Sequence, residues 1–340
     1  MTRPLRFAII GCGGVAATHA KALSQLSDTS LAGCIDIDPK KSLAFAGEWG
    51  CEVIDSFPMN LRQLEIDVAI VCTPSGRHFE SSAAVAEQGI HVLVEKPLET
   101  TVAKCDSLIK VCEEAGVMLG TVFPSRFRSS YRNMKEAIDN RKFGRIGMVH
   151  ANVPWYRDNK YFADVPWRGT LDLDGGGCLM NQGIHVVDLM TWMFGKPISV
   201  SCAKSRISHE IEGEDSIAVL MRFPNETIGT LNVTTIANPG FPRSIQVWGS
   251  EGCGTATDTR FKVGEISAKS ILDNDERAGA SAHANPLSLD AQFHRLAISD
   301  FVRAVRGRTR LCVTPIDGRD AVEIVEAAYK SASTGRAIHL

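Results

Sequence analysis

Short apolar runs alternate with amphipathic stretches through the first third of the chain. Runs typical of buried strands lie at residues 5–10, 30–35, 52–54, 66–72, 90–94 and 117–122. Helical patterns lie between several of them, at about 14–26, 80–88 and 101–115. Strands that alternate with helices pair in parallel through right-handed crossovers, so this region is predicted to be an α/β domain built on a parallel sheet.

The pattern changes beyond Val122, and Pro124 marks the exit from this domain. Another helix is expected at about 130–140. Strand-type runs follow it, at 147–153, 198–206, 215–223, 227–235 and 243–249. The turn signal Pro224-Asn225-Glu226 predicts an antiparallel hairpin, and two helical patterns end the chain. We therefore expect one domain of residues 1–123 and a second of residues 124–340.

Composition limits the function classes. Hydrophobic residues make up 44% of the 340 and charged residues 22%, as in ordinary globular proteins. The net charge of −2 argues against general nucleic-acid binding, which needs a basic surface. No apolar run is long enough to span a bilayer, and no signal-peptide layout precedes the first strand. The ten cysteines form no CxxC pair, so we expect no metal site and a reducing, cytoplasmic location.

A glycine-rich turn joins the first strand to the first helix: Gly11-Cys12-Gly13-Gly14-Val15-Ala16. In this GxGxxA pattern Gly11 permits the tight turn, Gly13 lets a pyrophosphate approach, and Ala16 allows close packing of helix on strand. The N–H groups of the helix N-terminus then face the phosphates. The position between strand and helix predicts a dinucleotide-binding Rossmann domain.

Asp36 follows the second strand, where an acid accepts hydrogen bonds from the adenosine ribose. A carboxylate there repels a 2′-phosphate, so NAD is favoured over NADP. The nearby Lys40 and Lys41 keep NADP open as an alternative. A simple turn or cap is the other interpretation of Asp36.

Five candidate residues follow the later strands of this domain: the polar Thr73, His78, Glu95 and Lys96, together with Pro74. Ligands of parallel sheets bind beyond the carboxyl ends of the strands, so we expect all five near the cofactor. Lys96 stands between a buried strand and Pro97. Its ammonium is suited to donate to a reacting oxygen or to titrate near neutrality. A salt bridge between Lys96 and Glu95 is the alternative.

A predicted helix that ends at Gly195 begins after the triplet Gly175-Gly176-Gly177. Asn181, His185 and Asp188 are spaced i, i+4 and i+7, so they are expected to share one polar face. That face is either a functional site or a hydrogen-bonded core network. The glycines allow the close approach of another backbone or of a flat ligand.

An aromatic and basic loop lies ahead of the triplet and contains Tyr156, Tyr161, Trp167 and Arg168. Aromatic faces pack on sugar rings and arginines bind hydroxyls, carboxylates or phosphates, so the loop is a candidate substrate site. A lid packed at a subunit interface is the alternative. Arg126, at the domain exit, is either a residue of the cleft or an ordinary surface arginine.

The chain resembles the Gfo/Idh/MocA oxidoreductases in the order and spacing of five motifs. These are the GxGxxA turn, Asp36, Thr73-Pro74, Glu95-Lys96-Pro97 and Asn181-x-x-x-His185. The resemblance implies a Rossmann domain followed by an α+β domain with a large, mostly antiparallel open sheet. It implies a homodimer or homotetramer joined through that sheet. Most members oxidise or reduce a secondary alcohol of a sugar, cyclitol or nucleotide sugar. Lys96 matches the family's active-site lysine, His185 its catalytic histidine, and Asn181 stands where many members have Asp.

We therefore predict an NAD(P)-dependent oxidoreductase in which His185 takes the hydroxyl proton and Lys96 donates to the same oxygen. Asn181 would fix the sugar or the imidazole, and Asp188 would set the tautomer of His185 or cap a backbone group. The expected cofactor site is Gly11, Gly13, Gly14, Val15, Ala16, Asp36, Thr73, Pro74, His78, Glu95 and Lys96. The expected substrate site is Arg126, Tyr156, Trp167, Arg168, Asn181 and His185. An NAD-retaining glycoside hydrolase and a non-catalytic dinucleotide-binding regulator are the rival functions.

Overall fold

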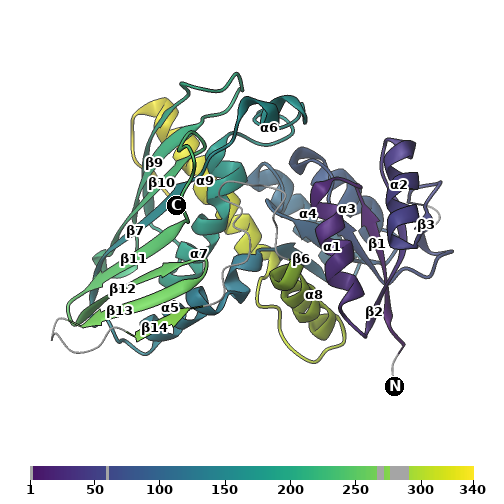
Figure 1. Cartoon of the computed structure of the whole chain (residues 1–340), viewed down its shortest axis with the longest axis horizontal. Helices are drawn as coiled ribbons and strands as arrows, with labels where there is room; N and C mark the ends of the chain where they lie inside the picture. Colours follow the sequence, from purple (N-terminus) through teal and green to yellow (C-terminus); the bar gives the residue numbers. More distant parts are fainter. Residues whose placement is uncertain (1–2, 59–60, 266–271, 276–290) are drawn as a thin grey trace. The chain divides into compact units, whose positions relative to one another are not determined.

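The computed structural model describes residues 3–58, 61–265, 272–275 and 291–340. The chain forms two compact units, Met1–Pro124 with Asp290–Arg319 and Ser125–Leu289 with Asp320–Leu340. Each unit is built on one β-sheet (Figure 1). None of the described helices has the length and apolar content needed to cross a bilayer. All ten cysteines lie in the described part of the chain, and none of them forms a disulfide there.

The first unit contains a six-stranded parallel sheet in the order β3-β2-β1-β4-β5-β6. Its strands are β1 (Leu5–Ile10), β2 (Thr29–Ile35), β3 (Glu52–Val53), β4 (Val68–Val71), β5 (His91–Glu95) and β6 (Leu119–Val122). Its helices α1 to α4 span Gly14–Ser24, Pro39–Trp49, His78–Ala86 and Val102–Glu114. The predicted α/β domain with a parallel sheet is confirmed.

The central strands of this sheet are continuous apolar runs because both of their faces are covered. Every residue of β4 and all but the first residue of β5 are buried, as expected for inner parallel strands. The strand order reverses between β1 and β4, because β2 and β3 lie on one side of β1 and the later strands on the other. A sheet of this type binds ligands beyond its strand ends at such a reversal.

Helix α8 (Ala291–Val305) belongs to the first unit, which differs from the expectation that residues 124–340 form one domain. Its apolar face joins the core of the parallel sheet, where Phe301 and Ile298 are buried with Ile9 and Val122. A Cβ on Gly120 would lie 2.8 Å from the Phe301 ring, so the glycine makes room for that ring. The chain therefore returns to the first unit to complete its core.

The second unit contains a nine-stranded sheet in the order β14-β13-β12-β11-β7-β10-β9-β8-β15. In chain order, β7 to β15 span Ile146–Pro154, Ser199–Ser205, Ser216–Arg222, Ile228–Thr234, Ser244–Gly249, Gly252–Thr257, Arg260–Glu265, Leu272–Asp275 and Ile338–His339. Of the described pairs only β7 with β10 is parallel, which confirms a mostly antiparallel sheet. The predicted hairpin is also confirmed, because β9 pairs with β10 across Pro224–Glu226.

The helices of this unit are α5 (Ser129–Asp139), α6 (Asn159–Ala163), α7 (Ile184–Phe194) and the greater part of α9 (Pro315–Thr334). The segment Leu179–Gly183, ahead of α7, is a π-helical turn where the sequence pattern predicts regular α-helix. A π turn holds an extra residue, so the i, i+4 spacing of Asn181 and His185 does not stack these side chains as in a regular helix.

Loss of the Phe301 ring should destabilise the first unit. We expect Phe301→Ala to lower the free energy of unfolding by about 3–5 kcal/mol, because a large aromatic side chain leaves a cavity in a closed core. The measurement is chemical denaturation followed by circular dichroism. Leu43→Ala is the control, since Leu43 is 65% exposed on α2 of the same unit and its loss should cost at most about 0.5 kcal/mol. Equal effects of the two substitutions would contradict the placement of α8.

Candidate active site

The turn between β1 and α1 has the geometry of a pyrophosphate cradle. Gly11 has a φ of +95°, and a Cβ there would lie 2.8 Å from the Cys72 carbonyl carbon, so only glycine fits. At Gly13, by contrast, a Cβ would meet no atom within 4 Å, so space lies beside that backbone. Helix α1 starts without a side-chain cap or an acid in its first turn. Its N-terminal N–H groups therefore suit an anion, and the turn fits a dinucleotide.

Asp36 is half-buried after β2, and its carboxylate lies beside the cradle. One oxygen accepts from the Cys12 backbone N–H at 2.8 Å and the other from the Asp38 N–H at 2.9 Å. Both bonds orient the carboxylate while each oxygen keeps a second lone pair. The remaining acceptor capacity fits a ribose diol. Lys40 and Lys41 are both exposed at the start of α2.

The loops after β4 and β5 are joined by His78. Its Nε2 lies 3.0 Å from the Thr73 carbonyl oxygen and its Nδ1 lies 2.8 Å from the Pro97 carbonyl oxygen. Burial lowers the pKa of His78, and a neutral ring has one N–H to donate to one of these carbonyls at a time. The histidine predicted to bind the cofactor is thus 1% exposed and holds two loops together.

The Thr73 hydroxyl is buried and has no hydrogen-bond partner within the described chain. Buried hydroxyls are normally paired, so this atom is suited to a ligand. Thr73 follows β4 and Lys96 follows β5, its neighbour in the parallel sheet. The cradle, Thr73 and Lys96 therefore lie along one edge of the sheet, as the motif order predicts.

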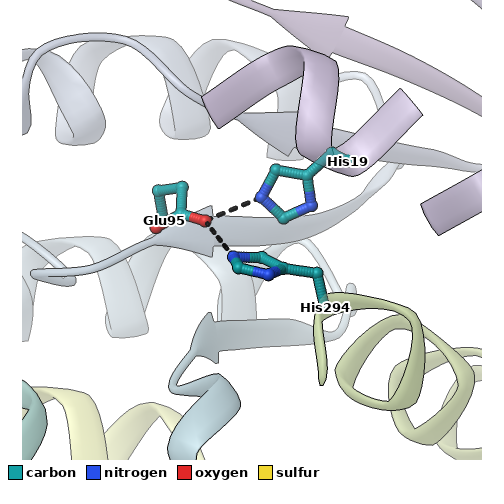
Figure 2. A group of neighbouring side chains, drawn as sticks. All are labelled: His19, Glu95 and His294. Carbon is teal, nitrogen blue, oxygen red and sulfur yellow. Dashed lines mark hydrogen bonds and ion pairs between the residues drawn. The ribbon is translucent and has the colours of Figure 1, made fainter. Parts of the chain in front are cut away.

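Lys96 is half-buried. Both carboxylate oxygens of its neighbour Glu95 form hydrogen bonds. Oε2 of Glu95 accepts from the Lys96 backbone N–H at 3.1 Å, and Oε1 lies 2.7 Å from Nε2 of His19 (Figure 2). Burial alone would raise the pKa of Glu95. The hydrogen bond and charge of His19, with His294 and Lys96, instead lower the pKa to about 2. Glu95 is thus an ionised group that binds the backbone of the lysine.

The glycine triplet in the second unit brings two backbones together. A Cβ on Gly177 would overlap the carbonyl of Glu214, and one on Gly176, whose φ is +145°, would overlap the Tyr329 hydroxyl. The Glu214 carboxylate accepts from the Leu179 N–H at 2.9 Å and from the Tyr329 hydroxyl at 3.1 Å. Burial raises the pKa of Glu214. Of the two roles open to the triplet, the structure shows close backbone approach.

Asn181 is held by a buried acid that the sequence pattern did not reveal. Its Nδ2 donates to the Asp174 oxygens at 2.8 and 3.1 Å, and Asp174 is 2% exposed. A carboxylate only accepts, so the amide nitrogen must face Asp174 and the carbonyl oxygen must face away. That oxygen accepts from Nε2 of Gln182 at 3.2 Å. The orientation of Asn181 is therefore fixed.

Asp188 pairs with Arg126 inside the second unit. Nη2 of Arg126 donates to Oδ1 at 2.6 Å and Nε to Oδ2 at 3.0 Å, and the residues are 2% and 1% exposed. The guanidinium also lies 5.6 Å from the centre of the Trp192 ring. The structure thus places Arg126 in a buried ion pair rather than on a surface. The hydrogen bonds from Arg126 give Asp188 a third role, beyond the two considered from the sequence.

The aromatic and basic loop packs on itself and on the segment that carries Asn181. The Arg168 guanidinium lies 3.9 Å from the centre of the Tyr161 ring and donates to the Tyr161 carbonyl at 2.8 Å. The Tyr161 hydroxyl accepts from Nε2 of Gln182 at 3.5 Å, and burial raises the pKa of Tyr161. Tyr156 forms an isolated bridge with Ile236, and Trp167 is half-buried.

Sequence reasoning missed four polar residues that the structure brings to these sites: His19, His294, Asp174 and Gln182. His19 carried a signal, because it lies three residues after Ala16, on the buried face of the first helix. His294 lies seven residues before Phe301, on the buried face of α8. Asp174 lies in a turn without periodicity, so no pattern marked it.

Removal of one partner of the Arg126–Asp188 pair should destabilise the second unit. We expect Asp188→Asn to lower the free energy of unfolding by about 3–5 kcal/mol, because a buried guanidinium loses its counter-charge. Denaturant titration measures the effect. Asp139→Asn is the matched control, since it breaks the exposed pair with Lys135 on α5 and should cost at most about 0.5 kcal/mol. An Asp188→Asn protein as stable as this control would show that the buried pair adds little.

Comparison with known proteins identifies the family. The oxidoreductase family with an NAD-binding Rossmann fold matches residues 5–123, and the GFO/IDH/MocA C-terminal domain matches residues 131–254. An inositol 2-dehydrogenase of Rhizobium meliloti (strain 1021) is 26% identical over 345 residues, which cover 99% of either chain.

Two solved structures, both in complex with NADH and UDP-GlcNAcA, are similar over all of this chain. The WlbA dehydrogenase of Bordetella pertussis has a TM-score of 0.89 and 28% identity, with 99% of its chain covered. That of Chromobacterium violaceum has a TM-score of 0.87 and 31% identity, with 97% covered. The glycine-rich turn and the two sheets agree with these matches. The chain belongs to the GFO/IDH/MocA family of NAD-binding oxidoreductases.

Proposed function

We propose that the protein transfers hydride between NAD and a secondary alcohol or ketone of a carbohydrate-like substrate, with Lys96 and His185 as catalytic residues. One observation carries this proposal. Three features lie at the carboxyl ends of neighbouring strands of one parallel sheet. They are the open space beside Gly13, the Lys96 side chain, and the buried Thr73 hydroxyl, which has no hydrogen-bond partner among the described residues. A dinucleotide in the cradle would extend along the edge that carries Lys96.

Each catalytic residue has a separate task. The Lys96 ammonium donates a hydrogen bond to the reacting oxygen and stabilises negative charge on it during oxidation. His185 takes the hydroxyl proton in oxidation and returns it in reduction. Asn181, fixed by Asp174, orients the sugar or the imidazole. NAD, when bound, accepts the hydride.

Nucleotide-linked sugar acids are the substrate class to test first. The two solved relatives described above hold UDP-GlcNAcA, whereas curated relatives at 25–26% identity are dehydrogenases of inositol and of D-glucoside. Some nucleotide-sugar and amino-sugar branches of the family also look similar at Asn181. We therefore rank the nucleotide sugars ahead of inositols and free sugars, with NADP as the second cofactor to test.

The decisive measurement is absorbance at 340 nm with purified protein, NAD and a panel of nucleotide sugars, sugar acids, inositols and free sugars. We expect one class to give NADH, and Lys96→Ala and His185→Ala to lower kcat by about 10²- to 10⁴-fold. Lys110→Ala is the control, because Lys110 is an exposed lysine of α4 in the same unit as Lys96. Turnover of Lys96→Ala within threefold of wild type would refute its catalytic role.

Two other results would favour the rival functions. Cleavage of a glycosidic substrate without net NADH would indicate an NAD-retaining hydrolase. Tight NAD binding by calorimetry, with no turnover of any substrate, would indicate a dinucleotide-binding regulator. A stable NADH signal that depends on His185 excludes both.

We also propose that the protein is a homodimer or homotetramer joined through the nine-stranded sheet, in the reducing cytoplasm. Large apolar side chains are exposed on four strands of that sheet: Met148, Leu220, Ile228 and Trp248. Met148 pairs directly with Ile228 and with Trp248 across neighbouring strands, so three of them adjoin. Such patches are typical of subunit interfaces.

A charge in this patch should separate the subunits. We expect Trp248→Glu to reduce the molar mass measured by light scattering to that of a monomer, because a buried unpaired carboxylate opposes association. Leu43→Glu, an equally drastic change at an exposed leucine of α2, should leave the mass unchanged. A monomeric wild-type protein would rule out this association.

A further inference from the structure

Three side chains from three elements meet beneath the end of β5. His19 comes from α1, Glu95 is the last residue of β5, and His294 comes from α8 (Figure 2). Both histidines direct Nε2 toward the same carboxylate oxygen, at 2.7 Å for His19 and 3.8 Å for His294. Their rings are perpendicular, with centres 5.1 Å apart. We call this group the histidine clamp.

The clamp is closed to solvent, so its polar atoms must find hydrogen-bond partners within the protein. His19, Glu95 and His294 are 0%, 7% and 5% exposed. Nδ1 of His19 has no hydrogen-bond partner in the described residues. An ionised carboxylate only accepts hydrogen bonds, so Nε2 of His19 carries the N–H that donates to Oε1 of Glu95. Glu95 is thus a buried anion that receives a hydrogen bond from His19.

Two histidines and a carboxylate are also typical ligands of zinc, but the distances here favour a hydrogen bond between His19 and Glu95. Two histidines and one glutamate are common zinc ligands, and these three ligand atoms lie within 4.8 Å of one another. Ligand atoms about 2.0–2.1 Å from a tetrahedral zinc ion stand about 3.3 Å apart. The 2.7 Å between Nε2 of His19 and Oε1 of Glu95 is instead a hydrogen-bond distance.

The second oxygen of Glu95 connects the clamp to the catalytic lysine. Oε2 accepts from the backbone N–H of Lys96 at 3.1 Å. On the other side of Lys96, the Pro97 carbonyl lies 2.8 Å from the buried His78 ring. Backbone groups on both sides of Lys96 are therefore held by buried side chains. A displacement of about 1 Å in a catalytic group costs up to about 100-fold in rate.

We propose that His19 and His294 are positioning residues for Lys96, which act by holding the Glu95 carboxylate against the Lys96 backbone. The proposal rests on the catalytic role of Lys96 described above. His19 contributes more than His294 because its nitrogen is the closer of the two. The clamp also ties α1, β5 and α8 together, so the pyrophosphate helix and the lysine share one support.

The test compares His19→Leu, which removes the donor, with His19→Gln, which keeps a nitrogen donor at similar reach. We expect His19→Leu to lower kcat by about 10- to 100-fold with KM and the Kd for NAD within threefold, and His19→Gln to recover most of kcat. His294→Leu should have a smaller effect. A purely structural role would not produce this split or this rescue.

A second measurement is independent of turnover. Amide hydrogen exchange at Lys96 should become about fivefold faster or more in His19→Leu, the factor that corresponds to one lost hydrogen bond, and return toward wild type in His19→Gln. His91→Leu is the matched control, because His91 lies at the other end of β5 and accepts from the Met118 N–H. It should leave exchange at Lys96 and kcat unchanged.

Two results would overturn the inference. One is unchanged exchange at Lys96 in His19→Leu. The other is stoichiometric zinc in the purified wild-type protein, measured by mass spectrometry of the metal and lost in His19→Leu, since a metal site would then occupy the clamp. Full activity of Lys96→Ala would instead refute the catalytic role of Lys96 in the proposed function. The two failures are distinguishable, because hydrogen exchange at Lys96 reports on the clamp and does not depend on catalysis.

Discussion

The hydrogen bonds of the buried, ionised Glu95 carboxylate are the interactions on which the carboxyl-end edge of the parallel sheet depends. Removing a carboxylate from water costs several kcal/mol unless hydrogen bonds and opposite charge compensate. Here His19 and the Lys96 backbone N–H supply the bonds, and the Lys96 charge lowers the free energy of the anion. The elements that provide them must therefore be present together. This requirement explains why α8, far along the chain, completes the first unit: it brings both Phe301 for the core and His294 for the carboxylate.

Buried carboxylates organise the second unit in the same way. Glu214 caps the backbone at Leu179, Asp174 orients Asn181, and Asp188 binds Arg126. All three acids bond within the π-helical turn and α7 or with residues packed on them. The helix that carries His185 is thus fixed by polar contacts at its start and at Asp188, while most of its other side chains are apolar. In the Arg126–Asp188 ion pair, the cost of removing both charges from water offsets much of their attraction.

Periodicity and turn chemistry predicted most of the elements but not their polar partners. The parallel strands, the GxGxxA turn and the hairpin at Pro224–Glu226 follow from local patterns, and the structure contains them. The π turn at Leu179–Gly183 was not predictable, because the apolar spacing there also fits a regular helix. Arg126 and Asp188 are 62 residues apart, and His19 and Glu95 are 76 apart, so their pairing depends on the tertiary fold alone. Arg126, which the sequence places on the surface or in the cleft, is instead buried with its partner Asp188.

Asn181 shows how the fold changes the meaning of a motif position. Many family members have a carboxylate there, whereas this chain has a neutral amide. The structure supplies a carboxylate directly behind it, since Asp174 accepts both bonds from Nδ2. A carboxylate at position 181 would face the buried Asp174 carboxylate with like charge, and the repulsion would disfavour ionisation of both groups. Asn181 and Asp174 therefore form a matched pair. The amide is the residue that this acid can hold in one orientation, which is what a positioning role in catalysis requires.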